Sequence, residues 1–232
     1  MLSPIATTIE LIAVFLIVNL AMWILPYKLF FYLSLSLYVG RRLWLTNGTS
    51  WKTLKKNLGL SPKDSVIDRL PVIVISVFFG RIITLIAEIY NPDFLANFFS
   101  FIQNNFPVNF ALFAGNLLGY SIWALFQQII LNGYFGNQIN SVINKRFISA
   151  LITGLLFAIT HLPNPVLMPV TFFGGTLCSY FFLNPNKQLR NVYLLALLHA
   201  ILGLTVSYSL PNDWHHNMRV GPGYYTYEKQ NR

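Results

Sequence analysis

Charged residues are scarce in this chain. Asp, Glu, Lys and Arg make up 10% of its 232 residues, whereas 55% are hydrophobic. A soluble domain carries about 25% charged residues, so the chain has too few of them to cover a globular surface. We therefore predict an all-α polytopic membrane protein with about six to seven transmembrane helices of roughly 20 residues each.

Cysteine is almost absent as well. Cys178 is the only one, which excludes an intrachain disulfide and a cysteine-rich metal site, and its apolar surroundings predict a packing role. The N-terminus lacks a basic segment, and its apolar stretch contains Glu10. We therefore expect a retained first helix and not a cleaved signal peptide.

Acidic residues are outnumbered by basic ones, and the net charge is +9. The basic residues gather in alternate loops, which is typical of the positive-inside rule and favours contact with membrane lipid over nucleic acid. A lipid-headgroup or partner site on the first basic loop is the alternative. The loops predicted to be cytoplasmic are residues 47–69, 136–146 and 184–190, while the loops without Lys or Arg are 91–107 and 162–165.

Hydropathy and chain breakers divide the chain into segments. A first region, 1–107, holds the N-terminal helices and the basic loop; a second, 108–210, holds the core helices; a polar, aromatic tail covers 211–232. The break at Pro26 leaves open one kinked span or two. The expected segments are Ile5–Leu25, Leu29–Leu45, a surface helix at Trp51–Asn57, then Leu70–Tyr90, Val108–Phe135, Phe147–His161, Val166–Leu183 and Asn191–Leu210.

Polar side chains inside the later spans are informative, because such groups cost several kcal/mol in a bilayer unless they are paired or functional. They occur at i, i+4 spacing, which places each pair on one helix face. Counting roughly 1.5 Å per residue puts them at similar depth, near the middle of the bilayer. We expect one buried site from three helices; separate interhelical hydrogen bonds are the alternative. The pairs are Gln128 (beside Gln127) with Asn132, Phe157 with His161, and His199 with Gly203.

The order and spacing of these groups resemble the CPBP family of CAAX-processing, bacteriocin-processing and immunity-associated intramembrane proteases. The family pattern is Glu-Glu-x-x-x-Arg, then Phe-x-x-x-His, then His-x-x-x-Asn or Asp. Phe157 and His161 match the second motif, and His199 begins the third. The resemblance covers about residues 108–210 and implies a CAAX-protease-like helical core. It further implies an endopeptidase that acts on membrane peptides or prenylated proteins, with a glutamate that activates water.

The chain departs from this pattern at its charged positions. Gln127 and Gln128 stand where the glutamates belong, and a glutamine cannot act as a general base. Gly203 replaces the Asn or Asp, which removes a candidate oxyanion donor. Asn132 replaces the arginine, so both signs of charge are lost together. This coherent loss predicts a neutral polar pocket on a protease-like scaffold.

Two functions follow from these residues. The first is an atypical intramembrane peptidase with a histidine as its base. The second is a catalytically inactive pseudoprotease that binds a membrane peptide, lipid or pigment as an immunity, chaperone or assembly factor. A divalent metal has only weak candidate ligands in His161 and His199, because stable sites use three or four strong ligands; His215 and His216 could add to them only if the tail folded back.

Two further features leave alternatives open. Arg81 and Glu88 lie seven residues apart within one predicted span. They predict an interhelical salt bridge or, for Arg81, a contact with the polar pocket. In the tail, Gly221-Pro222-Gly223 predicts a tight turn. The aromatic residues around it suit the membrane interface or a lid over the pocket.

Overall fold

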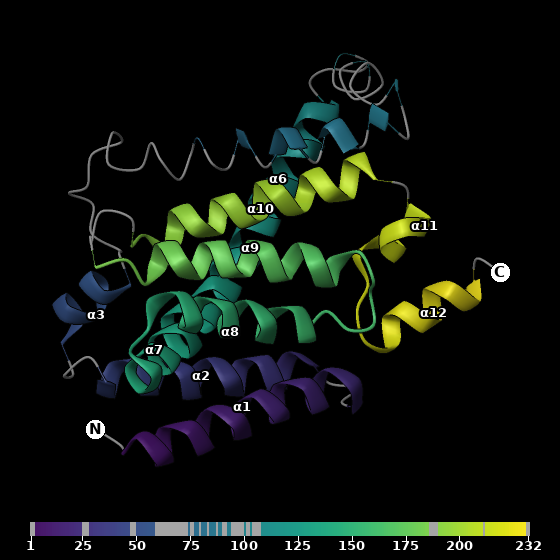
Figure 1. The fold of residues 1–232 in the computed structure, drawn as a ribbon. Helices are drawn as coiled ribbons and strands as arrows, with labels where there is room; N and C mark the ends of the chain where they lie inside the picture. The colour runs from purple at the N-terminus through teal and green to yellow at the C-terminus, as the bar shows by residue number, and fades with distance from the viewer. Residues whose placement is uncertain are drawn as a thin grey trace.

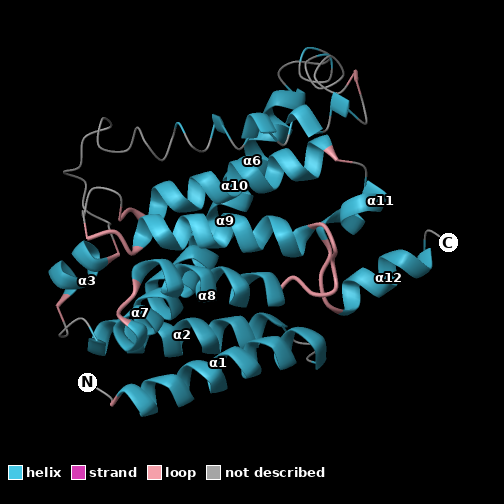
Figure 2. Ribbon diagram, in the orientation of Figure 1, coloured by secondary structure: helices cyan, strands magenta, loops and turns pink. Residues whose placement is uncertain are grey.

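The computed structural model describes residues 3–24, 28–46, 50–58, 108–185, 190–210 and 212–230, with scattered residues between 74 and 103. Throughout these residues the regular structure is helical and contains no strand (Figure 2), which confirms the all-α prediction. About half of the predicted span Leu70–Tyr90, most of the loop 91–107 and the residues Lys63, Arg69 and Lys187 lie outside the described residues.

The first apolar block forms two helices, α1 (Pro4–Ile24) and α2 (Lys28–Thr46), and not one kinked helix. An ion pair joins them, because Arg42 donates from Nε and Nη2 to the carboxylate of Glu10 at 2.6 and 2.5 Å. The hydroxyls of Tyr38 and Tyr134 donate to the same carboxylate at 2.6 and 2.9 Å. Since an unpaired carboxylate is costly within an apolar helix layer, this cluster fixes α1 against α2.

The predicted surface helix is α3 (Trp51–Asn57), which begins after Ser50, whose side chain accepts a hydrogen bond from the Thr53 N–H. The helix buries Leu54 and exposes its lysines. After it, the carbonyl of Leu58 accepts a hydrogen bond from the N–H of Val192 at 3.2 Å. This bond ties the α3 segment to the start of the last apolar helix.

The central helix does not end at Phe135, as the sequence had predicted. It begins as α6 (Val108–Gln128), widens into the π-helix η1 (Ile129–Gly136) and continues as α7 (Asn137–Ile143). It stops at Asn144, whose φ of 54° ends helical geometry. Gln127 and Gln128 therefore lie near the middle of one long helix, at the junction between α and π geometry, and π segments are frequent at functional sites.

Three helices, α8 (Arg146–Ile159), α9 (Leu167–Phe182) and α10 (Val192–Ser209), complete the core. The predicted spans are close to these bounds, but α8 ends before His161. A Cβ at Gly175 would lie 3.3 Å from the Gly154 Cα, so α8 and α9 touch backbone to backbone. The carbonyls at the end of α9 accept hydrogen bonds from two arginines, Arg146 to Tyr180 and Arg190 to Phe182, which satisfies groups that a helix end leaves unpaired.

The C-terminal tail is helical. It contains α11 (Asn212–His215), the 3₁₀ turn η2 (His216–Met218) and α12 (Pro222–Gln230). The predicted Gly-Pro-Gly turn is wrong in detail: Gly221 alone turns the chain, with φ +57°, and Pro222 begins a helix. The Nδ2 of buried Asn164, in the α8–α9 loop, donates to the carbonyls of His215 and Arg219 at 2.7 and 3.0 Å.

The helix ends form two groups (Figure 1). One end of the layer, at the left of the view, gathers the start of α1 with α3 and α7. The other end gathers the α8–α9 loop with α11 and α12, joined by the hydrogen bond from the Gly221 N–H to the Leu162 carbonyl at 2.8 Å. The described basic residues belong mainly to the first end, at Arg41, Arg42, Lys52, Lys55, Lys56, Lys145, Arg146 and Arg190.

Within the described residues, two helical segments are long and apolar enough to cross a membrane, Pro4–Ile24 and the continuous Phe110–Ile143. The helices α8, α9 and α10 are apolar but shorter. At roughly 1.5 Å per residue, α9 with its 16 residues spans less than the ~30 Å of a typical hydrocarbon core.

Candidate functional site

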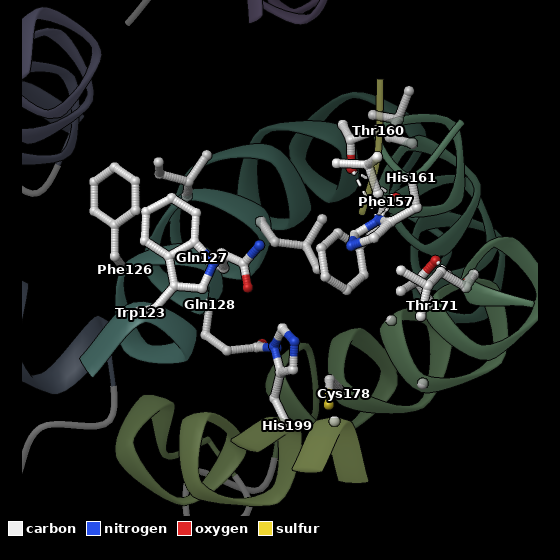
Figure 3. Close-up of a pocket in the computed structure, with 18 of the residues that line it drawn as sticks. Trp123, Phe126, Gln127, Gln128, Phe157, Thr160, His161, Thr171, Cys178 and His199 are labelled. Atoms are coloured by element: carbon white, nitrogen blue, oxygen red, sulfur yellow. Dashed lines mark hydrogen bonds between the residues drawn. The ribbon is translucent and has the colours of Figure 1, made fainter. Parts of the chain in front are cut away.

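A cavity of about 300 Å³ lies between the core helices, within the size range of small-molecule sites. We call it the central cavity. Its walls are mainly aromatic and aliphatic side chains of α1, α2, α6, η1, α8, α9 and α10 (Figure 3). Polar groups interrupt this lining at Tyr120, Gln127, Gln128, Thr160, His161, Thr171 and His199.

Four of the five predicted site residues line this cavity, namely Gln127, Gln128, His161 and His199. The fifth, Asn132, is fully buried behind the wall. Its Nδ2 donates to Oε1 of Gln128, and its Oδ1 accepts from the Ser179 hydroxyl at 2.6 Å. Asn132 therefore holds Gln128 in place and does not reach the cavity.

The hydrogen bonds of Gln128 determine the tautomer of His199. Because Oε1 of Gln128 accepts from Asn132, its Nε2 is the group that faces Nδ1 of His199, at 3.1 Å. An amide N–H₂ can only donate, so Nδ1 must be the unprotonated nitrogen. His199 is then neutral with its proton on Nε2, where no described residue accepts it, and Nε2–H is a hydrogen-bond donor available to a ligand.

His161 has the opposite tautomer. Its Nδ1 lies 2.7 Å from the carbonyl oxygen of Phe157, one turn earlier, and a carbonyl accepts only, so Nδ1 carries the proton. The Nε2 of neutral His161 is left with a lone pair. The side chain lies in the turn after α8, two residues beyond the end of the helix.

The ring of Phe157 joins the two histidines. It packs edge-on against His161, with ring centroids 4.7 Å apart, and against His199 at 5.5 Å. Figure 3 shows both imidazoles turned towards the same cavity. The structure thus brings a hydrogen-bond donor and an acceptor together, as expected for a shared site and not for separate interhelical contacts.

Gln127 adds an unused acceptor. Its Oε1 is buried and has no hydrogen-bond partner among the described residues, although such groups are nearly always paired in folded proteins. Gln127 lines the cavity beside Gln128 (Figure 3). An unpaired buried oxygen at a cavity wall is a natural contact for a ligand N–H.

Residues 109–205 match the family described as Rce1-like, type II CAAX prenyl endopeptidase Rce1-like. The chain carries a CAAX-protease-like domain. No curated protein and no solved structure matched the chain. The matched segment runs from α6 to α10 and contains every helix that places a predicted site residue. Proteins of this family are embedded in membranes, in agreement with the two helical segments that are long enough to span one.

Tyr120 is a cavity residue of this domain that sequence reasoning missed. A Cβ built on Gly203 would lie 2.5 to 2.9 Å from three atoms of its phenol ring, the hydroxyl included. The phenol therefore occupies the space that an Asn or Asp side chain at position 203 would need, and it packs edge-on against His199 at 6.0 Å. The signal was available, because position 120 lies two helical turns before Gln127 on the same face of α6.

The Tyr120 ring fills the space that a side chain at position 203 would need, and this predicts how substitutions at the two positions affect stability. Gly203→Asn alone should destabilise the protein by about 1–3 kcal/mol, as expected for overpacking, because the new side chain meets Tyr120. In a Tyr120→Ala background, which leaves room for the new side chain, Gly203→Asn should cost much less. Thermal unfolding of the two single variants and the double variant measures the coupling; additive effects would show that the two positions do not share the space.

The donor set for a metal ion is weak. No group of three or more His, Cys, Asp or Glu side chains close enough to hold an ion occurs among the described residues. His215 is buried and engaged with the Leu210 carbonyl at 3.0 Å, and His216 stacks on Tyr224. Neither lines the central cavity. Two histidines and neutral amides remain, which do not fit the usual zinc geometry.

The structure also bears on the predictions for Arg81 and for the C-terminal tail. Arg81 pairs with Glu88 at 2.8 Å on its own segment, not across helices, and does not line the central cavity. The tail does line it, through Met218 and Val220. Asn164 thus links the α8–α9 loop, which carries His161, to a segment of the tail that walls the cavity.

Proposed function

We propose that this chain is a multi-pass membrane protein whose CAAX-protease-like domain binds a membrane peptide without cleaving it. One observation carries the proposal. Gln128, at the position of a family glutamate, is held as a neutral amide between Asn132 and Nδ1 of His199. An amide cannot take up a proton at neutral pH, so Gln128 cannot activate water as the family's glutamate does.

The polar groups of the central cavity suit an amide ligand. The Nε2–H of His199 is placed to donate to a carbonyl oxygen, and the unpaired Oε1 of Gln127 to accept from an N–H. A peptide bond supplies both partners at once. The remaining lining is mostly apolar, as expected for a segment drawn from the bilayer or for a lipid-modified chain.

We further propose that the chain crosses the membrane about six to seven times, since α8, α9 and α10 can span with their flanking turns. The end that gathers α3 with the residues around Lys145 and Arg190 would face the cytoplasm by the positive-inside rule. The tail would then lie on the opposite side, where it closes the central cavity.

A binding experiment tests the ligand class. A fluorescent, acetylated tetraleucine amide is titrated into the full chain in lipid nanodiscs. His199→Phe keeps the ring volume but removes the donor, and Gln127→Met removes the acceptor. Each should weaken binding about tenfold, the effect of one lost hydrogen bond of roughly 1.4 kcal/mol.

His216→Phe is the matched control, because this histidine lies outside the central cavity. It should bind the probe as the unmodified chain does. Equal affinity for all four proteins would contradict an amide contact in the central cavity, and so would a probe that stays intact but fails to bind.

A peptidase that uses histidine as its base is the second candidate, and the tautomers favour it. In this reaction, Nε2 of His161 takes a proton from water as the oxygen attacks the carbonyl carbon, and His199 donates to the developing oxyanion. The C–N bond then breaks and the leaving amine takes the proton. Cleavage of prenylated or unprenylated membrane peptides, lost in both His161→Ala and His199→Ala, would establish this activity in place of simple binding. Cleavage that both variants retain would exclude it.

A further inference from the structure

A second cavity, of about 610 Å³, lies at the basic end of the helix layer. No residue lines both this basic cavity and the central one. Its walls come from the start of α1, the end of α2, Asn57 at the end of α3, η1, α7 and Arg190, two residues before α10. Two guanidinium groups, those of Arg42 and Arg190, face it from different elements.

Both arginines are held in place by hydrogen bonds, and each still has N–H groups that these bonds do not use. Arg42 uses Nε and Nη2 for the carboxylate of Glu10, and Arg190 uses the same two nitrogens for the carbonyl of Phe182 and Oδ1 of Asn137. A guanidinium has five N–H donors, so about three remain on each side chain. These fixed donors are already ordered, which lowers the entropic cost of binding an anion.

The charge of the basic cavity is unbalanced. Glu10 neutralises Arg42, whereas Arg190 has no carboxylate partner among the described residues, and its bonds go to neutral oxygens. The rest of the polar lining consists of hydroxyl and amide groups, including Thr7, Gln138 and Ser141. Such a set, with one net positive charge, suits an anion with several acceptor oxygens.

We propose that the basic cavity binds a phosphate group. Planar guanidinium donors match phosphate geometry, and the hydroxyl groups can supply further hydrogen bonds. The position favours a phospholipid headgroup as the source, because the cavity is bounded by Pro4 at the start of α1 and Thr46 at the end of α2. Helix ends are where a spanning protein meets the headgroups. The proposal does not depend on what the central cavity binds.

Native mass spectrometry of the full chain in detergent, with three probes, tests it. Phosphatidylglycerol supplies the headgroup, diacylglycerol the same acyl chains without phosphate, and inorganic phosphate the anion alone. We expect phosphatidylglycerol to bind at least tenfold more tightly than diacylglycerol and inorganic phosphate to compete with it. Arg190→Gln should weaken phosphatidylglycerol binding at least tenfold, a change of roughly 1.4 kcal/mol or more, because it removes a charged hydrogen-bond donor.

Two further variants complete the design. Gln138→Glu places a carboxylate in the basic cavity without touching either arginine or the end of α9, so it decides the question if Arg190→Gln fails to fold. Arg219→Gln removes one positive charge at the opposite end and should leave binding unchanged. In one outcome, inorganic phosphate is the only probe whose binding is weakened by both cavity variants and unchanged by Arg219→Gln. That result would support a phosphate site but overturn the proposal that a phospholipid headgroup supplies the phosphate. Binding that neither cavity variant alters would overturn the proposal.

Discussion

Gln128→Glu is expected to lower the apparent Tm by an amount on the order of 10 °C. One carboxylate oxygen can still accept from Asn132, but the other would face the lone pair on Nδ1 of His199. This repulsion between the carboxylate oxygen and the Nδ1 lone pair is relieved only if Nδ1 or the carboxylate takes up a proton. No Lys or Arg lines the central cavity, so the carboxylate is left without a counterion unless His199 takes up a proton. Such a buried, uncompensated charge costs roughly 3–5 kcal/mol, and each kcal/mol shifts the Tm of a chain of this size by about 2–4 °C.

Thermal unfolding by tryptophan fluorescence, with the yield of folded protein, measures this effect. Gln230→Glu makes the same isosteric change at the exposed end of α12 and should leave the Tm within about 1 °C, since exposed substitutions rarely exceed 0.5 kcal/mol. An undiminished Tm and yield for Gln128→Glu would mean that the site accepts a carboxylate. That result would count against a binding role and in favour of a hydrolytic one.

The site was largely predictable because its polar residues recur at one helical spacing within apolar segments. Gln128 and Asn132 do hydrogen-bond across one turn, and His161 and His199 do face one cavity. Sequence spacing could not show which of these residues reaches the cavity. The eight-residue π-helix after Gln128 changes the hydrogen-bonding register from i+4 to i+5, and Asn132 is thereby turned towards Ser179 on α9.

The contacts of the tail could not be predicted because they use backbone acceptors. Asn164 donates to the carbonyls of His215 and Arg219, and any sequence offers carbonyls. The composition of residues 211–232 suggested a polar chain at the interface, since neither α11 nor α12 has an apolar face long enough to predict its partner. Their place beside the α8–α9 loop became apparent only from the fold.

Gly154→Ala should destabilise the protein by about 3 kcal/mol or more, at the upper end of what overpacking costs. The added Cβ would lie 2.1 Å from Oγ1 of Thr176, 2.7 Å from the carbonyl oxygen of Phe172 and 2.8 Å from the Thr176 nitrogen. A side chain can rotate away, but the two backbone atoms can only move if α9 separates from α8. That separation would displace Phe157, and with it the contact that joins the two histidines.

A glycine-to-alanine change at an uncrowded helix position should have the opposite effect on stability, and it therefore serves as the matched control. A Cβ on Gly115 in α6 meets nothing within 4 Å, so Gly115→Ala should be neutral or stabilise the helix by up to ~1 kcal/mol. Thr176→Ala should rescue Gly154→Ala only in part, because it removes the hydroxyl but leaves both backbone contacts. Full rescue would locate the conflict in the Thr176 side chain alone, and equal behaviour of the two glycine variants would contradict the close approach of α8 and α9.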